Sequence, residues 1–221
     1  MRFRNLGAEF LGTAALVMTV VGSGEMAQSL SRDIAVQLLI NSLCTAAILY
    51  LLITLLAGIS GAHFNPLVTL VFAYKRQISI GQTLQFIIAQ FIGALTGAGL
   101  ANLLFALPIF TASTHLRSGS HLFLSELIAT AGLIFTIFLA IDQKLEKKIP
   151  MLVACWIGAA YFFTSSTSFA NPAVTFARGW SDTFAGIAPE SIAPFIAAQL
   201  IGAVLGFALT QSLRSKGKSK K

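Results

Sequence analysis

The chain has 221 residues, of which 56 % are hydrophobic and only 10 % are charged, and its mean hydropathy is +0.80. This is too little charge for the surface of an ordinary soluble domain, so the composition excludes that class and predicts a membrane protein. The formal net charge of +7 does not indicate a nucleic-acid partner, because the basic residues are divided among short segments and form no mixed basic and aromatic surface.

Six apolar runs are each long enough to cross about 30 Å of hydrocarbon as a helix, which takes roughly 20 residues. The first run is not expected to be a cleaved signal, because Glu9 interrupts it and no small-x-small cleavage pattern follows. The pattern therefore predicts an all-α membrane protein with six transmembrane helices. The expected spans are 6–24, 34–59, 83–107, 122–141, 149–165 and 192–212.

The basic residues predict the orientation of these spans. An even number of spans puts both termini on the same side, and all but three of the 15 Lys and Arg residues fall on that side. Since short cytoplasmic segments carry an excess of Lys and Arg, we expect both termini to be cytoplasmic. The C-terminal segment RSKGKSKK is expected to be a solvated flank that can contact anionic lipid. The three remaining residues are Arg32, Arg117 and Arg178.

Two Asn-Pro segments, HFNPLVTL around Asn65 and FANPAVTF around Asn171, fall between apolar runs. Each leaves room for only about nine or ten helical residues, or some 13 to 15 Å at 1.5 Å per residue. Asparagine is a preferred N-cap, and proline is favourable in the first helical turn. Each segment therefore predicts a half-helix, beginning at Pro66 or Pro172, that reaches about halfway across the membrane.

The chain also repeats itself: AQFIGALTGA from Ala89 matches AQLIGAVLGF from Ala198, and AEFLGT around Glu9 matches SELIAT around Glu126. We therefore expect one domain over 1–221, with repeat halves at about 1–110 and 120–221. Three spans per half is an odd number, so the repeat is inverted. The half-helices then meet end to end near the midplane, where their positive ends repel cations and irregular backbone lines a watery path.

No pattern in the chain favours an enzyme, a metal site or a cofactor. Neither cysteine, Cys44 or Cys155, has a partner at metal-ligand spacing. The same is true of the histidines, His63, His115 and His121, and we find no nucleophile elbow or glycine-rich phosphate loop.

The paired Asn-Pro boxes, AEFLGT, SGAHFNPLVTL and the AQ..GA spans resemble the aquaporin or major intrinsic protein family over essentially the whole chain. The resemblance implies a right-handed six-helix bundle with one pore per chain. It also implies assembly as a homotetramer that conducts water or small uncharged solutes without a cofactor. The boxes at the midplane of the pore would be Asn65, Pro66 and Leu67, and Asn171, Pro172 and Ala173.

Within the family an arginine usually follows the second box, where it forms part of a selectivity constriction, but this chain has Val174. Gapless counting against the family pattern adds Thr45, Ala159 and Ser168 to the constriction, which should then be wide and weakly polar. The run FTSSTSFANPAVTFAR is similar to the branch associated with bacterial arsenic operons. That resemblance implies a bacterial inner membrane and adds neutral arsenic hydroxides or methylated arsenicals to glycerol as solutes. Alternatively, Val174 only packs against a neighbouring helix, and the chain is an orthodox water-selective channel.

Two further residues have open roles. Arg178 lies one helical turn beyond Val174, and its guanidinium is a hypothetical replacement for the missing cation at the outer vestibule. The alternative is an interfacial arginine that reaches lipid headgroups or pairs with Asp182. Leu67, in place of the usual alanine, either narrows the junction or packs against a neighbour.

Glu9 and Glu126 stand at equivalent repeat positions, and a carboxylate inside a span needs a partner. The resemblance implies that they buttress the half-helix loops, with His63 near Glu9. An alternative class is a proton-coupled secondary transporter, which also uses inverted repeats and broken helices. Another is a membrane packing or adhesion protein with no open path.

Overall fold

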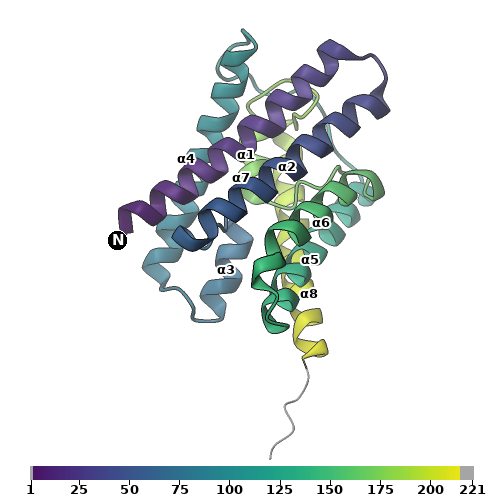
Figure 1. Cartoon of the computed structure of the whole chain (residues 1–221). Coiled ribbons are helices and arrows are strands. Elements are labelled where there is room, and N and C mark those ends of the chain that lie inside the picture. Colours follow the sequence, from purple (N-terminus) through teal and green to yellow (C-terminus); the bar gives the residue numbers. More distant parts are fainter. Residues whose placement is uncertain (1, 215–221) are drawn as a thin grey trace, which may run out of the picture.

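In the computed structural model, which describes residues 2–214, these residues form eight α-helices, one short 3-10 helix and no β-strand (Figure 1). The helices are α1 (Arg2–Leu30), α2 (Ile34–Ser60), α3 (Pro66–Tyr74), α4 (Ile80–Leu104), α5 (Ser120–Asp142), α6 (Ile149–Phe163), α7 (Pro172–Arg178) and α8 (Pro189–Leu213), with the 3-10 helix η1 (Glu146–Lys148) before α6. The prediction of an all-helical chain is confirmed.

Five of these helices, α1, α2, α4, α5 and α8, are long and apolar enough to cross a membrane. Helix α6 has 15 residues, which is short for a full span, so the sixth transmembrane helix stays a prediction. Each predicted run coincides with one of these six helices, although the helix ends differ. The last predicted flank, RSKGKSKK, lies outside the described residues after Arg214.

The short helices α3 and α7 have 9 and 7 residues and begin at Pro66 and Pro172. Each is preceded by an asparagine in an extended conformation, Asn65 or Asn171, whose side chain caps the helix. A proline costs no hydrogen bond in the first turn of a helix, because the backbone N–H groups of that turn have no acceptor inside the helix. Figure 1 shows α7 behind the long diagonal helices α1 and α2.

Glycines allow the long helices to pack closely in the same way in both halves. Helix α1 packs against α4, and α5 packs against α8. A Cβ atom at Gly97 would overlap the backbone carbonyl of Ala14 on α1, and one at Gly206 would overlap that of Ala131 on α5. Only glycine permits this approach, so these repeated small residues are explained by helix packing.

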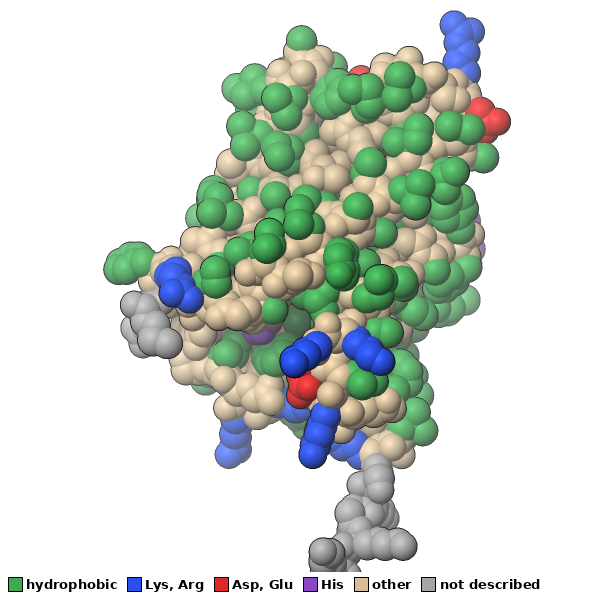
Figure 2. All heavy atoms as spheres, viewed as in Figure 1, with side chains coloured by type: hydrophobic (Ala, Val, Ile, Leu, Met, Phe, Trp, Pro, Cys, Tyr) green, Lys and Arg blue, Asp and Glu red, His purple; other side chains and the backbone are tan. Residues whose placement is uncertain are grey.

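The surface has two distinct ends and an apolar flank. Figure 2 shows hydrophobic side chains over the flank, while most Lys and Arg side chains in view gather at one end. We call this the basic end; it is formed by Lys75, Arg76, Lys144, Lys147, Lys148 and Arg214. The opposite end, here the loop end, is formed by residues 105–119 and 179–188, which hydrogen-bond to each other from Thr111 N to Trp180 O and from Ser113 N to Gly179 O.

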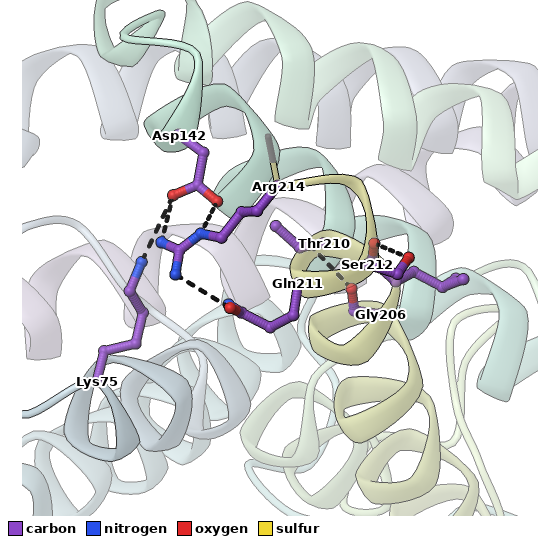
Figure 3. Close-up of polar contacts among 8 residues, drawn as sticks. Lys75, Asp142, Gly206, Thr210, Gln211, Ser212 and Arg214 are labelled. Carbon is purple, nitrogen blue, oxygen red and sulfur yellow. Dashed lines mark hydrogen bonds and ion pairs between the residues drawn. The ribbon is translucent and has the colours of Figure 1, made fainter. Parts of the chain in front are cut away.

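An ion-pair cluster joins three helix ends at the basic end (Figure 3). Both Arg214 Nε and Nη2 donate to the Asp142 carboxylate at 2.6 Å, and Lys75 Nζ lies 3.9 Å from Asp142 Oδ1. Arg214 Nη1 also donates to Gln211 Oε1 at 3.0 Å. Partial burial lowers the pKa of Lys75, and Asp142 opposes that shift. The cluster ties the end of half-helix α3 to the ends of α5 and α8.

Candidate functional site

The two half-helices meet at their N-terminal ends, where each asparagine makes two kinds of hydrogen bond. Asn65 Oδ1 accepts from the backbone N–H of Leu67 at 2.9 Å, and Asn171 Oδ1 accepts from that of Ala173 at 3.0 Å. The amide groups cross to the other half: Asn65 Nδ2 donates to Ala170 O and Asn171 Nδ2 donates to Phe64 O, both at 2.8 Å. Each asparagine therefore caps its own helix and holds the opposite loop.

The loops before the half-helices have unusual backbone at matching positions. Ala62 and Phe64 have φ angles of 50° and 48°, and Ser168 and Ala170 have φ angles of 52° and 48°. Residues other than glycine seldom adopt this left-handed region, which costs about 1–3 kcal/mol for each residue. Such backbone persists only where surrounding contacts fix it. The loops must therefore be held from outside.

Glu9 supplies that support in the first half. Its carboxylate is fully buried and accepts four hydrogen bonds. The donors are Ser60 Oγ at 2.6 Å, His63 N at 3.0 Å, Phe64 N at 2.8 Å and Gln90 Nε2 at 2.7 Å. Two of these donors are backbone N–H groups of the left-handed loop, so the carboxylate fixes its path.

Glu126 has the same arrangement in the second half, and it is also fully buried. Its donors are Ser166 Oγ at 2.6 Å, Phe169 N and Ala170 N at 2.9 Å, and Gln199 Nε2 at 2.6 Å. Four donors replace the hydration that a carboxylate loses in an apolar bundle, so neither glutamate is left without partners.

His63 lies beside this network, but its ring does not contact Glu9. Only its backbone N–H reaches the carboxylate, while ring atom Nδ1 lies 3.1 Å from Thr69 Oγ1. The ring stacks on Phe72, with ring centres 4.4 Å apart. In the second half Phe169 occupies the corresponding place, two residues before the asparagine.

A cavity of about 110 Å³ runs past the junction of the half-helices. Both asparagines line it, and its wall extends to Ile141 and Ile149 toward the basic end and to Tyr161 toward the loop end. Most of the wall is apolar. A path with a few polar groups at the junction and hydrocarbon walls elsewhere suits the passage of small molecules better than tight binding.

The structure brings three of the four residues expected at the constriction to this cavity: Thr45, Ser168 and Val174. Ala159 is instead exposed on the outer side of α6, and Tyr161 lines the cavity. The Tyr161 hydroxyl lies 3.0 Å from Thr45 Oγ1. Gapless counting misplaced Ala159 because a non-helical loop separates α6 from Asn171, and helical period does not carry through it.

Arg178 is buried, with 2 % of its surface exposed, and it lines the cavity. Its Nε donates to the carbonyl of Ala185, and its guanidinium carbon lies 3.3 Å from the centre of the Phe169 ring. It does not pair with Asp182, whose carboxylate accepts from the backbone N–H and hydroxyl of Thr114. The cavity wall at the loop end therefore contains an arginine, although not at position 174.

Arg117 was missed as a site residue by sequence reasoning, which placed it only on the side opposite the termini. Its Nε donates to Gly186 O at 2.8 Å and its Nη2 to Phe184 O at 3.3 Å. Its guanidinium carbon lies 5.1 Å from the Phe169 ring centre. Burial lowers the pKa of Arg117 to about 10, so it remains charged at neutral pH. Nothing in its local sequence signals this burial.

Leu67 and Ala173 are both buried in the main core, and Leu67 has 1 % of its surface exposed. Neither residue is part of the cavity wall. Pro66 and Pro172 are buried at the helix starts. Among residues 2–214, no group of three or more His, Cys, Asp or Glu residues is arranged to hold a metal ion.

Three comparisons place the chain among known proteins. The family model described as major intrinsic protein matches residues 1–169. The chain is 47 % identical over 210 residues to the aquaglyceroporin AqpS of Rhizobium meliloti (strain 1021), covering 95 % of this chain and 90 % of that relative. It is 32 % identical over 185 residues to aquaporin-4 of Mus musculus, covering 79 % of this chain and 57 % of that relative.

A solved structure is also similar: the aquaglyceroporin from Plasmodium falciparum superposes with a TM-score of 0.69 at 21 % sequence identity. The match covers 96 % of this chain and 97 % of that one. At this level of identity the similarity establishes the fold and not the solute.

Proposed function

Because the chain belongs to the major intrinsic protein family, whose members are channels and not enzymes, we propose that it is a passive channel for small uncharged solutes. These are water, glycerol and neutral hydroxides of arsenic or other metalloids. The observation that carries the proposal is the cavity that runs past both Asn-Pro boxes with the two asparagines in its wall.

The junction supports this function chemically. Each asparagine amide has two hydrogens, and one is donated to the opposite loop. The second hydrogen of Asn65 and Asn171 is then free to bind an oxygen of a passing solute. The N-terminal ends of α3 and α7 add positive partial charge at the same place, which disfavours cations. A neutral molecule with oxygen atoms is the class that such a junction passes best.

The loop end of the cavity sets the size of the solute in this proposal. Thr45, Ser168 and Val174 are small, which favours glycerol over water alone. A water-selective channel is the second candidate, and one observation favours it: two large side chains, Tyr161 and Arg178, line the same region.

The proposed architecture follows from the same family. We infer six spans with α6 as the shortest, α3 and α7 as re-entrant half-helices, and a single domain whose halves, about 1–110 and 120–221, form an inverted repeat. The basic end would face the cytoplasm together with both termini, in a bacterial inner membrane. A homotetramer with lipid around its apolar flank completes the proposal.

Stopped-flow light scattering on proteoliposomes tests the function by comparing osmotic water permeability with glycerol uptake. Val174→Trp would place a large side chain in the cavity. The matched control is Val204→Trp on α8, because Val204 is 69 % exposed and does not line the cavity. Fast water and glycerol flux, lost only in Val174→Trp, would support the proposal and make arsenite the next solute. Water flux without glycerol flux would favour the water-selective candidate.

Absence of any flux above that of empty liposomes would overturn the channel proposal. A proton gradient applied in the same preparation separates a channel from a secondary transporter, because the flux through a channel does not depend on it.

A further inference from the structure

We propose that Arg178 is the specificity-determining residue of this channel: it excludes cations and hydrogen-bonds polyhydroxylated neutral solutes at the loop end of the cavity, and Arg117 and Phe169 position it. This inference rests on the proposed channel function and goes beyond it, since that function requires only a path and not a particular selecting residue.

The guanidinium of Arg178 is held in place at Nε, while its two terminal nitrogens are free. Its Nε is taken by the carbonyl of Ala185, and its plane is held over the Phe169 ring at 3.3 Å. Among residues 2–214 its two terminal nitrogens have no hydrogen-bond partner, and the side chain lines the cavity. Their N–H groups are therefore available to a solute.

The repeat shows why an arginine at this position reaches the cavity. Val174 in the second half corresponds to Val68 in the first, because both lie three residues after the box asparagine, and both line the cavity. Seven residues after the asparagine stand Phe72 in the first half and Arg178 in the second, and these also line it. The fold therefore presents this position to the path in both halves.

Two arginines, Arg117 and Arg178, carry positive charge at this end; the buried carboxylate of Glu126 attracts both, but neither arginine forms an ion pair with it. Within residues 2–214 the only ion pairs lie at the basic end, around Asp142. Glu126 is occupied by its four donors, and Asp182 by Thr114. In a narrow path with low-dielectric walls, charges that are screened weakly repel a cation strongly.

The surroundings of the free N–H groups define the class of solute. Ser168 Oγ is buried, lines the cavity and has no partner among the described residues. The Thr45 and Tyr161 hydroxyls lie on the same wall, while Val174 is apolar. A solute with several hydroxyl oxygens on one side and carbon on the other fits this arrangement. Urea, which has one oxygen, makes fewer such bonds.

Arg117 and Phe169 hold this geometry. The carbonyls of Phe184, Ala185 and Gly186 are consecutive, and they accept from Arg117, Arg178 and Arg117 in turn. The two guanidinium groups therefore share one short loop and one aromatic ring. Loss of Arg117 would release that loop and with it the carbonyl that fixes Arg178.

The test compares Arg178→Gln, Arg178→Lys and Arg117→Gln in proteoliposomes, with Arg76→Gln as a control that removes an equal charge at the basic end. The readouts are glycerol flux, the glycerol-to-urea ratio and proton or potassium leak followed with an internal dye. We expect Arg178→Gln to raise the cation leak by on the order of tenfold or more and to lower the glycerol-to-urea ratio. Arg178→Lys should keep the leak low but lower the ratio. Arg117→Gln should shift both readouts in the direction of Arg178→Gln by a smaller factor.

Unchanged leak and ratio in Arg178→Gln, with wild-type glycerol flux intact, would overturn the inference and leave the proposed function standing. A wild-type protein that conducts nothing would instead remove the proposed function itself. If the Arg178 variants do not fold, Phe169→Leu can be used instead. It keeps the positive charge of Arg178 and removes only the aromatic ring on which the guanidinium stacks. It should lower the glycerol-to-urea ratio while the leak stays low, and an unchanged ratio would also overturn the inference.

Discussion

The two half-helix segments, residues 60–74 and 166–178, share one framework, and one of the differences between them is a stacked pair of side chains. In the first, the His63 ring stacks on Phe72 at 4.4 Å; in the second, the Arg178 guanidinium stacks on Phe169 at 3.3 Å. The pairs occupy the same two repeat positions, two residues before and seven after the asparagine. The two segments thus share the contacts that hold their loops, while the stacked pair carries a histidine in the first segment and an arginine in the second.

The largest expected effect tests the shared framework. Glu9→Ala and Glu126→Ala each leave four donors, most of them buried, without an acceptor. At about 1–3 kcal/mol for each unsatisfied group, we expect either variant to lose several kcal/mol of stability and little folded protein to remain. Thermal unfolding in detergent measures this loss. If one variant were tolerated and the other were not, the two halves would not be held in the same way.

A smaller effect is expected where the boxes differ. Leu67→Ala makes the first box match the second, which has Ala173. Since Leu67 is 1 % exposed in the core, the variant should lose about 2–5 kcal/mol of stability. Because Leu67 is not in the cavity wall, glycerol flux per folded channel should stay within about twofold of wild type. A larger increase in flux would show that Leu67 narrows the path.

The comparison between the stacked pairs can be tested with His63→Phe. This substitution places in the first half the phenylalanine ring that the second half has at the corresponding position, Phe169. The variant loses only the contact between His63 Nδ1 and Thr69 Oγ1, so we expect a stability loss of about 1 kcal/mol. The cation leak should not change, because the charge at the loop end is untouched. A rise in leak would place part of the selectivity in the first half.

The smallest effect concerns the loop end. Hydrogen bonds from the Thr114 backbone N–H and hydroxyl lower the pKa of Asp182 below its ordinary value. The folded pKa is therefore below the unfolded one, so this contact stabilises the protein above a pH of about 4 and is lost as the pH falls through the folded value. Asp182→Asn should flatten the acid side of the profile of unfolding temperature against pH. An unchanged profile would assign the acid sensitivity to other carboxylates.

Much of the framework could be predicted from the sequence because it is local or repeated. An asparagine before a proline between apolar runs is sufficient to place the start of each half-helix, and repeat alignment pairs Glu9 with Glu126. Thr45, Ser168 and Val174 line the cavity, as the sequence predicted, although their role in selecting the solute stays a prediction. These expectations rest on helical period or on a match between two segments.

The missed features depend on loops that fold back from a distance. Tyr161 replaces Ala159 at the cavity because left-handed residues between α6 and Asn171 break the helical period. The burial of Arg178 requires the carbonyl of Ala185, which follows a turn of several residues. Arg117 reaches the same loop from a connector 67 to 69 residues earlier. No periodicity or capping rule in the sequence encodes such contacts.

The crossed amides of the asparagines have a consequence for how the channel is made. Asn65 donates to the carbonyl of Ala170, 105 residues later in the chain, and Asn171 donates back to Phe64. During synthesis the first half-helix therefore lacks its partner until the second box has left the ribosome. A truncated chain that ends between the two boxes has only one side of the path, so the biosynthetic intermediate has no completed conduit through which the cell could leak.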